Sequence, residues 1–294
     1  MVLFLLCCMI CGCDGLFEQN NAPTENLQMY FPPVSESDAQ MEVHIIDVGQ
    51  GDCALVRGGG ANILVDAGEN GLGSRVVEYL KSIGVTRLDW VVGSHPHSDH
   101  IGGLDTVISK LDVDNIMMPR LPDELVPINQ TYTDVLDAVE KKGLQITAAK
   151  AGDVFTFGDM AMQVLSPSIN SNYSDANDYS VVLRFVCGEF EYLTTGDISS
   201  MVEIDIIDNG YDVSADILKL AHHGSYTGTC RSFLNAVDPM YAVIMCGHEN
   251  DYGHPHDAVM DRIYENKISP IRTDRLGNVK IVCNDGVIDV YALD

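Results

Sequence analysis

The sequence predicts an α/β fold in which two packed β-sheets carry helices on their outer faces. At 294 residues with 46% hydrophobic side chains, the chain is long and apolar enough for a large globular domain. Apolar runs of strand length come in groups, and segments with helical spacing separate some of them. No segment repeats at a fixed period. Two stacked sheets with outer helices would bury such strands and helices together in one layered domain.

The individual elements are expected where short apolar runs or helix-period segments end at Gly, Asn or Asp. Strands are expected at residues 41–47, 53–57, 62–66, 88–92, 154–157, 161–165, 181–186, 191–195, 214–220 and 241–245, and near Val279 and Val287. Helices are expected at residues 75–83, 104–110, 132–142 and 256–266. Gly143 follows the third helix in the usual C-terminal position, which supports that boundary.

The N-terminal segment predicts an exported protein. Residues 1–10 are almost wholly apolar but too few to span a bilayer, and Ile10-Cys-Gly-Cys13 resembles a bacterial lipoprotein cleavage box. We therefore expect a signal peptide over 1–13, a flexible polar tether over 14–40 and one hydrolase domain over 41–294. No Lys or Arg precedes the apolar run, so a buried N-terminal helix is the alternative. The expected location is the cell surface, through a lipid anchor on Cys13, or the medium if Cys13 is unmodified.

The charge balance limits the partners. With 17 Lys and Arg against 43 Asp and Glu, the formal net charge is -26. A broad nucleic-acid-binding surface needs clustered cations, so none is expected. A nucleic-acid substrate held locally by metal ions remains compatible with this charge.

The densest group of candidate ligands is His95-x-His97-x-Asp99-His100. The apolar run 88–92 precedes it as a strand, and Gly102-Gly103 opens the helix that follows. Imidazole nitrogens and carboxylate oxygens suit zinc and similar divalent ions. The alternative is a polar surface loop that is rich in histidine by chance, but the chain has only nine histidines in all. The motif therefore predicts a metal site.

This motif resembles the metal motif of the metallo-β-lactamase superfamily. Further segments resemble the branch that contains the extracytoplasmic metallohydrolase domain of the DNA-uptake protein ComEC, and phosphorylcholine esterases. They are Asp47-Val-Gly-Gln-Gly-Asp52, Leu64-Val-Asp66-Ala-Gly68, Thr195-Gly-Asp197, His222-His-Gly-Ser225 and Tyr252-Gly-His-Pro-His256. The resemblance implies a four-layer αββα sandwich formed by a single domain, with two divalent metal ions, zinc first and manganese or iron as alternatives.

The resemblance also implies a ligand set. One ion takes His95 and His97, the other takes Asp99 and His100, and Asp197 bridges them. His222 is expected as the last ligand, with His223 facing substrate instead. The family histidine about twenty residues before Asp197 is absent, and Asn177-Asp-Tyr-Ser180 stands in that region. Either the coordination position is open to water, or Asn177 or Asp178 fills it.

The remaining candidates surround this set. Asp99, His223 and His254 are the expected catalytic residues, with His254 placed to donate to a phosphate oxygen or a leaving group. Asp47, Asp52 and Asp66 are expected to orient ligand histidines. Asn177, Ser225 and His256 are expected near substrate or behind the ligands.

The function expected from these features is an extracytoplasmic, dinuclear, metal-dependent hydrolase that acts on a phosphodiester through an activated water. The substrate would be a small molecule or a polymer: nucleic acid, a nucleotide or a phosphocholine ester. Two alternatives remain open. One is a hydrolase of the same fold for a lactone, thioester or β-lactam. The other is a surface lipoprotein that binds metal without catalysis.

Overall fold

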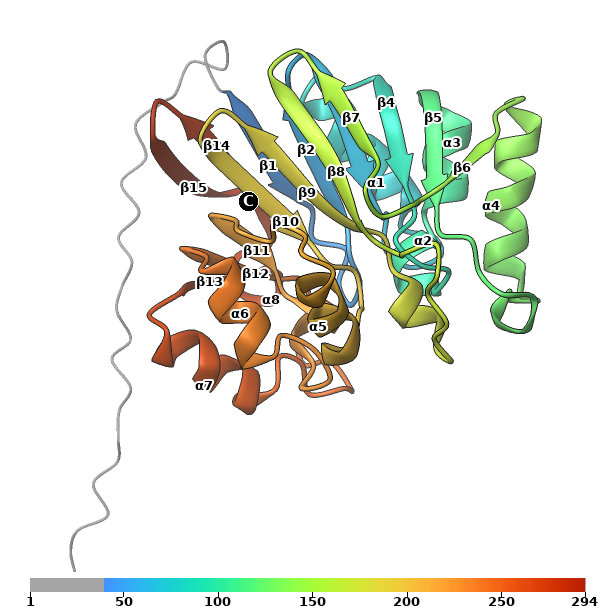
Figure 1. The fold of residues 1–294 in the computed structure, drawn as a ribbon. Coiled ribbons are helices and arrows are strands. Elements are labelled where there is room, and N and C mark those ends of the chain that lie inside the picture. Colours follow the sequence, from blue (N-terminus) through green and yellow to red (C-terminus); the bar gives the residue numbers. More distant parts are fainter. Residues whose placement is uncertain (1–39, 294) are drawn as a thin grey trace, which may run out of the picture. The chain divides into compact units, whose positions relative to one another are not determined.

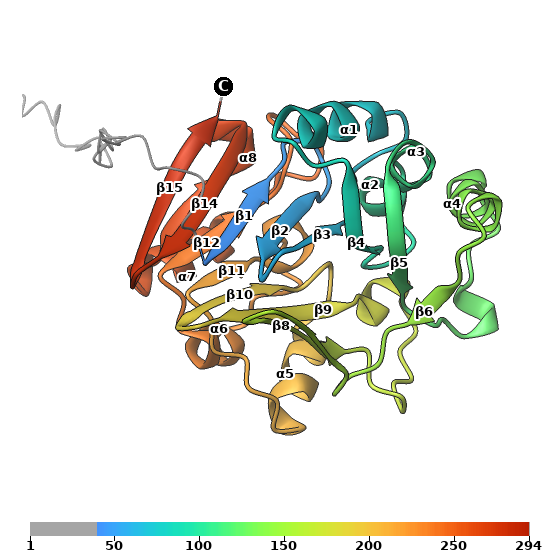
Figure 2. The ribbon, with the colours of Figure 1, turned by 90° about the horizontal axis from the view of Figure 1, so that it is seen from above.

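The computed structural model describes residues 40–293, and the expected signal peptide and most of the expected tether lie outside this range. The described residues form two mixed β-sheets stacked face to face, with helices on both outer faces (Figures 1 and 2). This is the four-layer αββα arrangement that the sequence predicts. No helix of the described range is long and apolar enough to cross a membrane.

The first sheet has the strand order β15-β14-β1-β2-β3-β4-β5-β6. Its strands are β1 Met41–Ile45, β2 Ala54–Gly58, β3 Ala61–Val65, β4 Arg87–Val92, β5 Asp112–Met118, β6 Ile146–Ala148, β14 Asn278–Asn284 and β15 Val287–Leu293. The second sheet has the order β13-β12-β11-β10-β9-β8-β7. Its strands are β7 Val154–Phe157, β8 Met160–Ser166, β9 Val182–Cys187, β10 Phe190–Thr194, β11 Ile217–Lys219, β12 Tyr241–Ile244 and β13 Ser269–Arg272.

Helices cover the outer face of each sheet. The helices are α1 Gly73–Ser82, α2 Ser98–Ile101, α3 Leu104–Lys110, α4 Gln130–Lys141, α5 Ser200–Asp208, α6 Arg231–Val237, α7 Asp257–Glu265 and α8 Thr273–Leu276, with 3-10 turns η1 Asp123–Leu125, η2 Ala176–Tyr179 and η3 Ala221–Gly224. One apolar core lies between the sheets. A second lies under α1, α3 and α4, and a third under α5, α6 and α7. Three apolar layers therefore hold the four structural layers together.

Local sequence explains most of these elements. Helix α1 buries Val76, Val77 and Leu80 on one face, at helical spacing. Helix α4 begins after Asn129, whose side chain accepts a hydrogen bond from the Tyr132 amide at 2.9 Å. Strand β1 is buried on both faces: Met41, Val43 and Ile45 enter the core between the sheets. Strands β5, β6 and β13 and helices α5 and α6 were not among the elements expected from sequence, and the structure adds them.

The loops at one edge of the two sheets carry the candidate site. Strands β3, β4, β5 and β6 run parallel, and so do β10, β11, β12 and β13. Because parallel strands end at the same edge, the loops after β3, β4, β10, β11 and β12 meet there. These loops contain the motifs of the sequence, except Asp47–Asp52, which lies between β1 and β2.

Candidate metal centre

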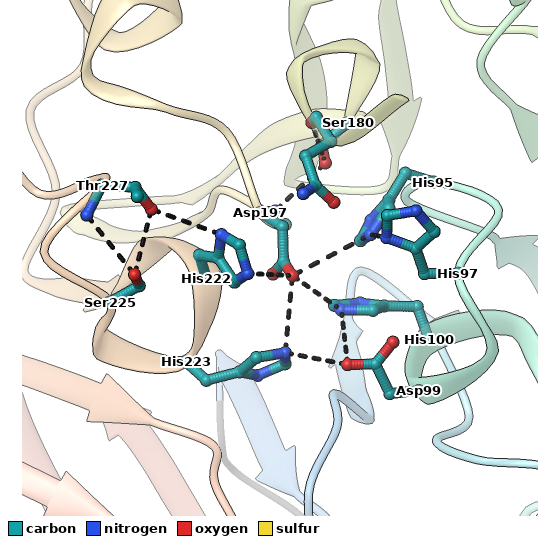
Figure 3. A network of polar contacts seen from close by, with 12 residues as sticks. His95, His97, Asp99, His100, Ser180, Asp197, His222, His223, Ser225 and Thr227 are labelled. Atoms are coloured by element: carbon teal, nitrogen blue, oxygen red, sulfur yellow. Dashed lines mark hydrogen bonds and ion pairs between the residues drawn. The ribbon is translucent and has the colours of Figure 1, made fainter. Parts of the chain in front are cut away.

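A buried carboxylate, Asp197, lies at the centre of the site (Figure 3). We call the following residues the Asp197 cluster: His95, His97, Asp99, His100, Asp197, His222 and His223. Four imidazoles surround one oxygen of Asp197. Its Oδ2 lies 3.2 Å from Nε2 of His100, 3.4 Å from that of His223, 3.7 Å from that of His222 and 3.9 Å from that of His95. His97 joins them through Nδ1, at 3.1 Å from Nε2 of His95.

Hydrogen bonds from behind fix two of these rings. His100 Nδ1 lies 2.9 Å from the Asp66 carboxylate, which only accepts, so Nδ1 donates and Nε2 is left to face Asp197. His223 Nδ1 donates to the Met245 carbonyl at 2.9 Å, and its Nε2 faces Asp99 at 3.2 Å and Asp197. A ring whose rear nitrogen donates in this way presents a free lone pair, as metal-ligating histidines do.

The cluster carries a strongly negative field. Burial alone would lower the pKa of His100 and His223, but the carboxylates of Asp197 and Asp52 outweigh it and raise both pKa values well above the usual range. Burial would raise the pKa of Asp197, but His100 and His223 hold it well below its usual value. A field of this sign attracts divalent cations, whose binding displaces protons from histidine.

The donors fit a divalent metal. His100 Nε2 and Asp197 Oδ1 are buried atoms that make no hydrogen bond within residues 40–293. Ligand atoms of Asp52, His100, Asp197 and His223 all lie within 4.8 Å of one another. Unpaired buried donors and acceptors of this kind are costly unless something binds them. Imidazole and carboxylate ligands suit zinc, manganese and iron.

Lys219 is a residue that the sequence analysis missed. Its side chain is fully buried; Nζ forms an ion pair with Asp52, lies 3.6 Å from Asp197 Oδ1 and donates to the Gly196 carbonyl at 2.8 Å. Burial lowers the pKa of a lysine, but Asp52 and Asp197 outweigh it and raise the pKa of Lys219. Lys219 therefore holds Oδ1 of Asp197, so that Oδ2 faces the histidines. A lysine inside the apolar run 217–221 was the available signal, since lysine is rarely buried without a partner.

The two histidines after β11 differ from expectation. His223 is 2% exposed and lies among the buried ligand atoms, whereas the side chain of His222 is 30% exposed at the rim. The backbone turns here with φ of 51° and 55°, values uncommon for residues other than glycine. Sequence alone placed His222 as the ligand and His223 facing substrate; the observed positions favour the reverse.

The outer candidates divide into near and remote groups. Asp66 contacts His100 of the cluster, and Asp52 forms an ion pair with Lys219. Asp47 does not reach the cluster: it accepts from the Gly49 amide and faces Arg75, so it stabilises the glycine-rich turn. His256 also lies outside, where Nδ1 accepts from the Tyr226 amide.

Ser225 and the residues of the 177–180 segment complete this survey. The Ser225 hydroxyl bonds the amide and hydroxyl of Thr227. Asp178 accepts from the Ser199 amide at 2.9 Å, so that carboxylate stabilises a turn. Asn177 differs, because its side-chain oxygen is buried and makes no hydrogen bond in the described part of the chain. Of the two alternatives to the family histidine, Asn177 has the free oxygen.

A cavity of about 460 Å³ opens over the cluster. Its walls include Asp99, Asn177, Asp197, His222, His223 and His254. The His254 ring lies 5.8 Å from the ring of His222 and stacks on Tyr252 at 5.6 Å. Burial, with the charge of His223, lowers the pKa of His254 to about 4, so its ring is neutral near pH 7. Only an anionic group beside it would raise that pKa enough for the ring to carry a proton.

The glycine-rich turn also serves the site. Gly51 has φ of 140°, and a Cβ atom there would lie 2.2 Å from the Asp99 carbonyl oxygen. The Asp52 amide donates to the same carbonyl at 3.1 Å. The turn between β1 and β2 thus holds the backbone of the metal motif, and only glycine fits at that contact.

Comparison with known proteins gives the family. Residues 46–128 match the metallo-beta-lactamase superfamily model. The chain is 30% identical over 261 residues to ComE operon protein 3 of Bacillus subtilis, covering 81% of this chain and 32% of that protein. It is also 30% identical over 267 residues to competence protein ComA of Neisseria gonorrhoeae, covering 90% of this chain and 35% of the relative. The chain spans about a third of the length of these curated relatives.

Solved structures agree on the fold. Tm1679, described as a metal-dependent hydrolase of the beta-lactamase superfamily, superposes with a TM-score of 0.54 at 14% identity, covering 83% of this chain and 100% of that one. CmlA, a diiron beta-hydroxylase from Streptomyces venezuelae, gives a TM-score of 0.52 at 12% identity, covering 89% and 55%. These structures show the fold alone, and the match of residues 46–128 and the sequence relatives show that the chain is similar to ComEC-like members of the metallo-β-lactamase superfamily.

Proposed function

We propose that this protein is an extracytoplasmic, dinuclear, metal-dependent phosphodiesterase. The observation that carries the proposal is the position of Asp197 Oδ2, within 3.2–3.9 Å of four imidazole nitrogens at the base of an open cavity. His95, His97 and Asp197 would hold one ion, with the free oxygen of Asn177 completing that set. Asp99, His100, Asp197 and His223 would hold the other. Two such ions supply a water nucleophile at neutral pH and charge stabilisation for the phosphoryl oxygens.

The chain's own residues would orient and complete the reaction. Asp66 and the Met245 carbonyl fix the rings of His100 and His223, and Lys219 fixes the Asp197 carboxylate. Rings held from behind cost little reorganisation during the reaction. His222 and His254 face the cavity and would donate hydrogen bonds to substrate oxygens. A phosphate oxygen beside His254 would raise its low pKa, which lets the ring pass a proton to the leaving group.

The names of the relatives support a phosphodiester over other bonds. The relatives include the competence protein ComA of Neisseria gonorrhoeae, and a "recombination protein 2" of Haemophilus influenzae is 28% identical over 245 residues. A DNA strand is therefore the substrate that we would test first.

The test is a substrate panel with metal analysis. Purified protein reconstituted with zinc, manganese or iron should hydrolyse bis(p-nitrophenyl) phosphate and contain more than one ion per chain. Faster turnover of a lactone, thioester or β-lactam would favour the other hydrolase function. Bound metal without any turnover would favour a binding protein, and no bound metal would reject the proposal.

Location is part of the same proposal. The leader over 1–13 supports a place at the cell envelope, where Cys13 would anchor this chain. The wild-type protein should then partition into detergent, and Cys13→Ser should release it. A wild-type protein that remains in the cytosol would reject export.

A further inference from the structure

The structure has a second cavity, of about 420 Å³. It is formed by the segments that follow β5, β6 and β8, together with η2. β4, β5 and β6 are adjacent parallel strands, so their ends lie one strand spacing apart, roughly 5 Å each. The metal motif follows β4, and Figure 2 shows β5 and β6 continuing the sheet beyond it. A single extended substrate could therefore reach both cavities.

Two chain segments contribute residues to both cavities. The segment after β5 contributes Asp123 to the second cavity and Asn129 to the metal cavity. The η2 turn contributes Tyr179 to the second and Asn177 to the metal cavity.

Two cations line the second cavity without acidic partners. Arg120 and Lys150 form no ion pair or side-chain hydrogen bond with another residue in the range 40–293. In a chain of net charge -26, with far more acidic than basic residues, such cations are not needed to balance the fold. Asp123 is the acidic group of the cavity wall and it pairs with neither.

An unpaired donor accompanies the cations. The Ser171 hydroxyl lines the cavity, is buried and has no hydrogen-bond partner in the described structure. A buried hydroxyl without a partner costs free energy that a bound acceptor would recover. Guanidinium, ammonium and hydroxyl groups together are the donors that proteins use for phosphate.

We propose that this second cavity binds a second phosphate of the substrate, so that the enzyme acts on chains of phosphodiesters rather than on isolated diesters. The inference rests on the proposed phosphodiesterase function and adds the residues that would hold the phosphate next to the scissile one. Arg120 and Lys150 hold the neighbouring phosphate while the scissile phosphate lies at the Asp197 cluster.

The test compares substrate lengths in the full chain. Wild-type kcat/KM should rise from the thymidine dinucleotide to the octanucleotide. The double variant Arg120→Gln/Lys150→Gln should lose this gain, roughly 10- to 100-fold on the octanucleotide, since two charge-assisted contacts disappear. Its turnover of bis(p-nitrophenyl) phosphate and its metal content should stay at the wild-type level. Lys81→Gln/Lys110→Gln removes the same charge from exposed, unpaired lysines of α1 and α3 and should change neither.

A binding measurement separates this inference from the proposed function. Fluorescence anisotropy with a labelled octathymidylate should show weaker binding by the Arg120/Lys150 variant and a salt dependence reduced by about one ion. If no diester is hydrolysed but this difference persists, the proposed function fails and the phosphate subsite stands. If the variant retains the full length preference and full octathymidylate binding, the subsite is rejected. An equal loss on the octanucleotide and on bis(p-nitrophenyl) phosphate would also reject it.

Discussion

Two polar clusters of the molecule are built in opposite ways, one on the first sheet and one where the loops of both sheets meet. The first, which we call the Glu42 cluster, consists of Glu42, His44, Arg57, Tyr79 and Lys280. Its one carboxylate accepts from Arg57 at 2.9 Å and Lys280 at 2.7 Å, and lies 3.3 Å from His44. The other nitrogen of His44 bonds the Tyr79 hydroxyl at 2.8 Å. Every polar group of this cluster therefore has a partner within the protein.

The Asp197 cluster and its supports hold too many acceptors for their fixed cations. The carboxylates of Asp52, Asp66, Asp99 and Asp197 converge there. Lys219 forms ion pairs with two of them, Asp52 and Asp197. Buried oxygens of Asp52 and Asp197 make no hydrogen bond in the described residues. The difference teaches that buried charge alone does not mark a site: a closed cluster stabilises the fold, and an open one binds something.

The largest effect is expected from removing the Asp197 carboxylate at the centre of the candidate metal site. Asp197→Ala removes the carboxylate that faces four histidines, so we expect loss of at least one ion and a fall in kcat of at least about 10³-fold. Elemental analysis and turnover of bis(p-nitrophenyl) phosphate measure both. The variant also loses the contacts of Asp197 with His100, His223 and Lys219, so urea unfolding of the chelated proteins checks that the fold is retained. Full turnover by the variant would show that Asp197 does not bridge metals.

Glu42→Gln should give the opposite result. Removing the charge leaves Arg57, His44 and Lys280 without their carboxylate, and breaking a buried pair of this kind costs about 3 kcal/mol. Urea unfolding should report this loss, with metal content and kcat at the wild-type level. Loss of metal in this variant would mean that the Glu42 cluster also affects metal binding, so that its role would not be confined to stabilising the fold.

His254→Ala distinguishes substrate contacts from ligands within the open site. We expect kcat to fall about 10²-fold with metal content unchanged, because general acid catalysis is needed only in the transition state. The fall in kcat should be smaller for a substrate that releases p-nitrophenolate, because this group leaves without protonation. It should be larger for a substrate with an alkyl leaving group. His100→Ala is the control and should lose metal. A metal-depleted His254 variant would instead make that residue a ligand.

Lys219→Met tests the support behind Asp197. The variant keeps the length of the side chain but frees Asp52 and Asp197 Oδ1, so we expect metal affinity to change by about 10- to 100-fold. Competition with a fluorescent zinc chelator measures the affinity without relying on turnover. Unaltered affinity would show that the histidines orient Asp197 without Lys219.

The smallest effect concerns acid stability of the Glu42 cluster. Burial would raise the pKa of Glu42, but its contacts with His44 and Lys280 outweigh this and lower it from 4.5 to about 2. Because the folded pKa is the lower one, the stabilisation is present above pH 4.5 and is lost as the pH falls towards 2. The stability gap between wild type and Glu42→Gln should therefore narrow by about 1 kcal/mol between pH 5 and pH 3.5. Urea titrations of the chelated proteins measure this gap. A gap that does not change with pH would mean that Glu42 is not the titrating group.

Local patterns were enough for much of the fold. Runs such as 62–66 and 88–92 are apolar because parallel strands are buried on both faces, and the structure has β3 and β4 there. Helix α5 escaped prediction because Met201 and Ile204 are apolar yet 51% and 44% exposed, which blurs the helical period. Strand β5 escaped because its first residues include Asp112, Asp114 and Asn115.

The sequence by itself determined the donors of the metal centre, because His95 to His100 lie on one short segment and need only a strand and a helix to hold them. Both adjacent histidines, His222 and His223, face Asp197, and only the tertiary structure decided that His223 is the buried one and that His222 lies at the rim, since that depends on how β11 ends beside β10 and β12. It also decided that Asp52 meets Lys219 and that Asp47 does not reach the site. Such pairs are separated by up to 167 residues, and no local spacing encodes a contact that forms only when two sheets stack.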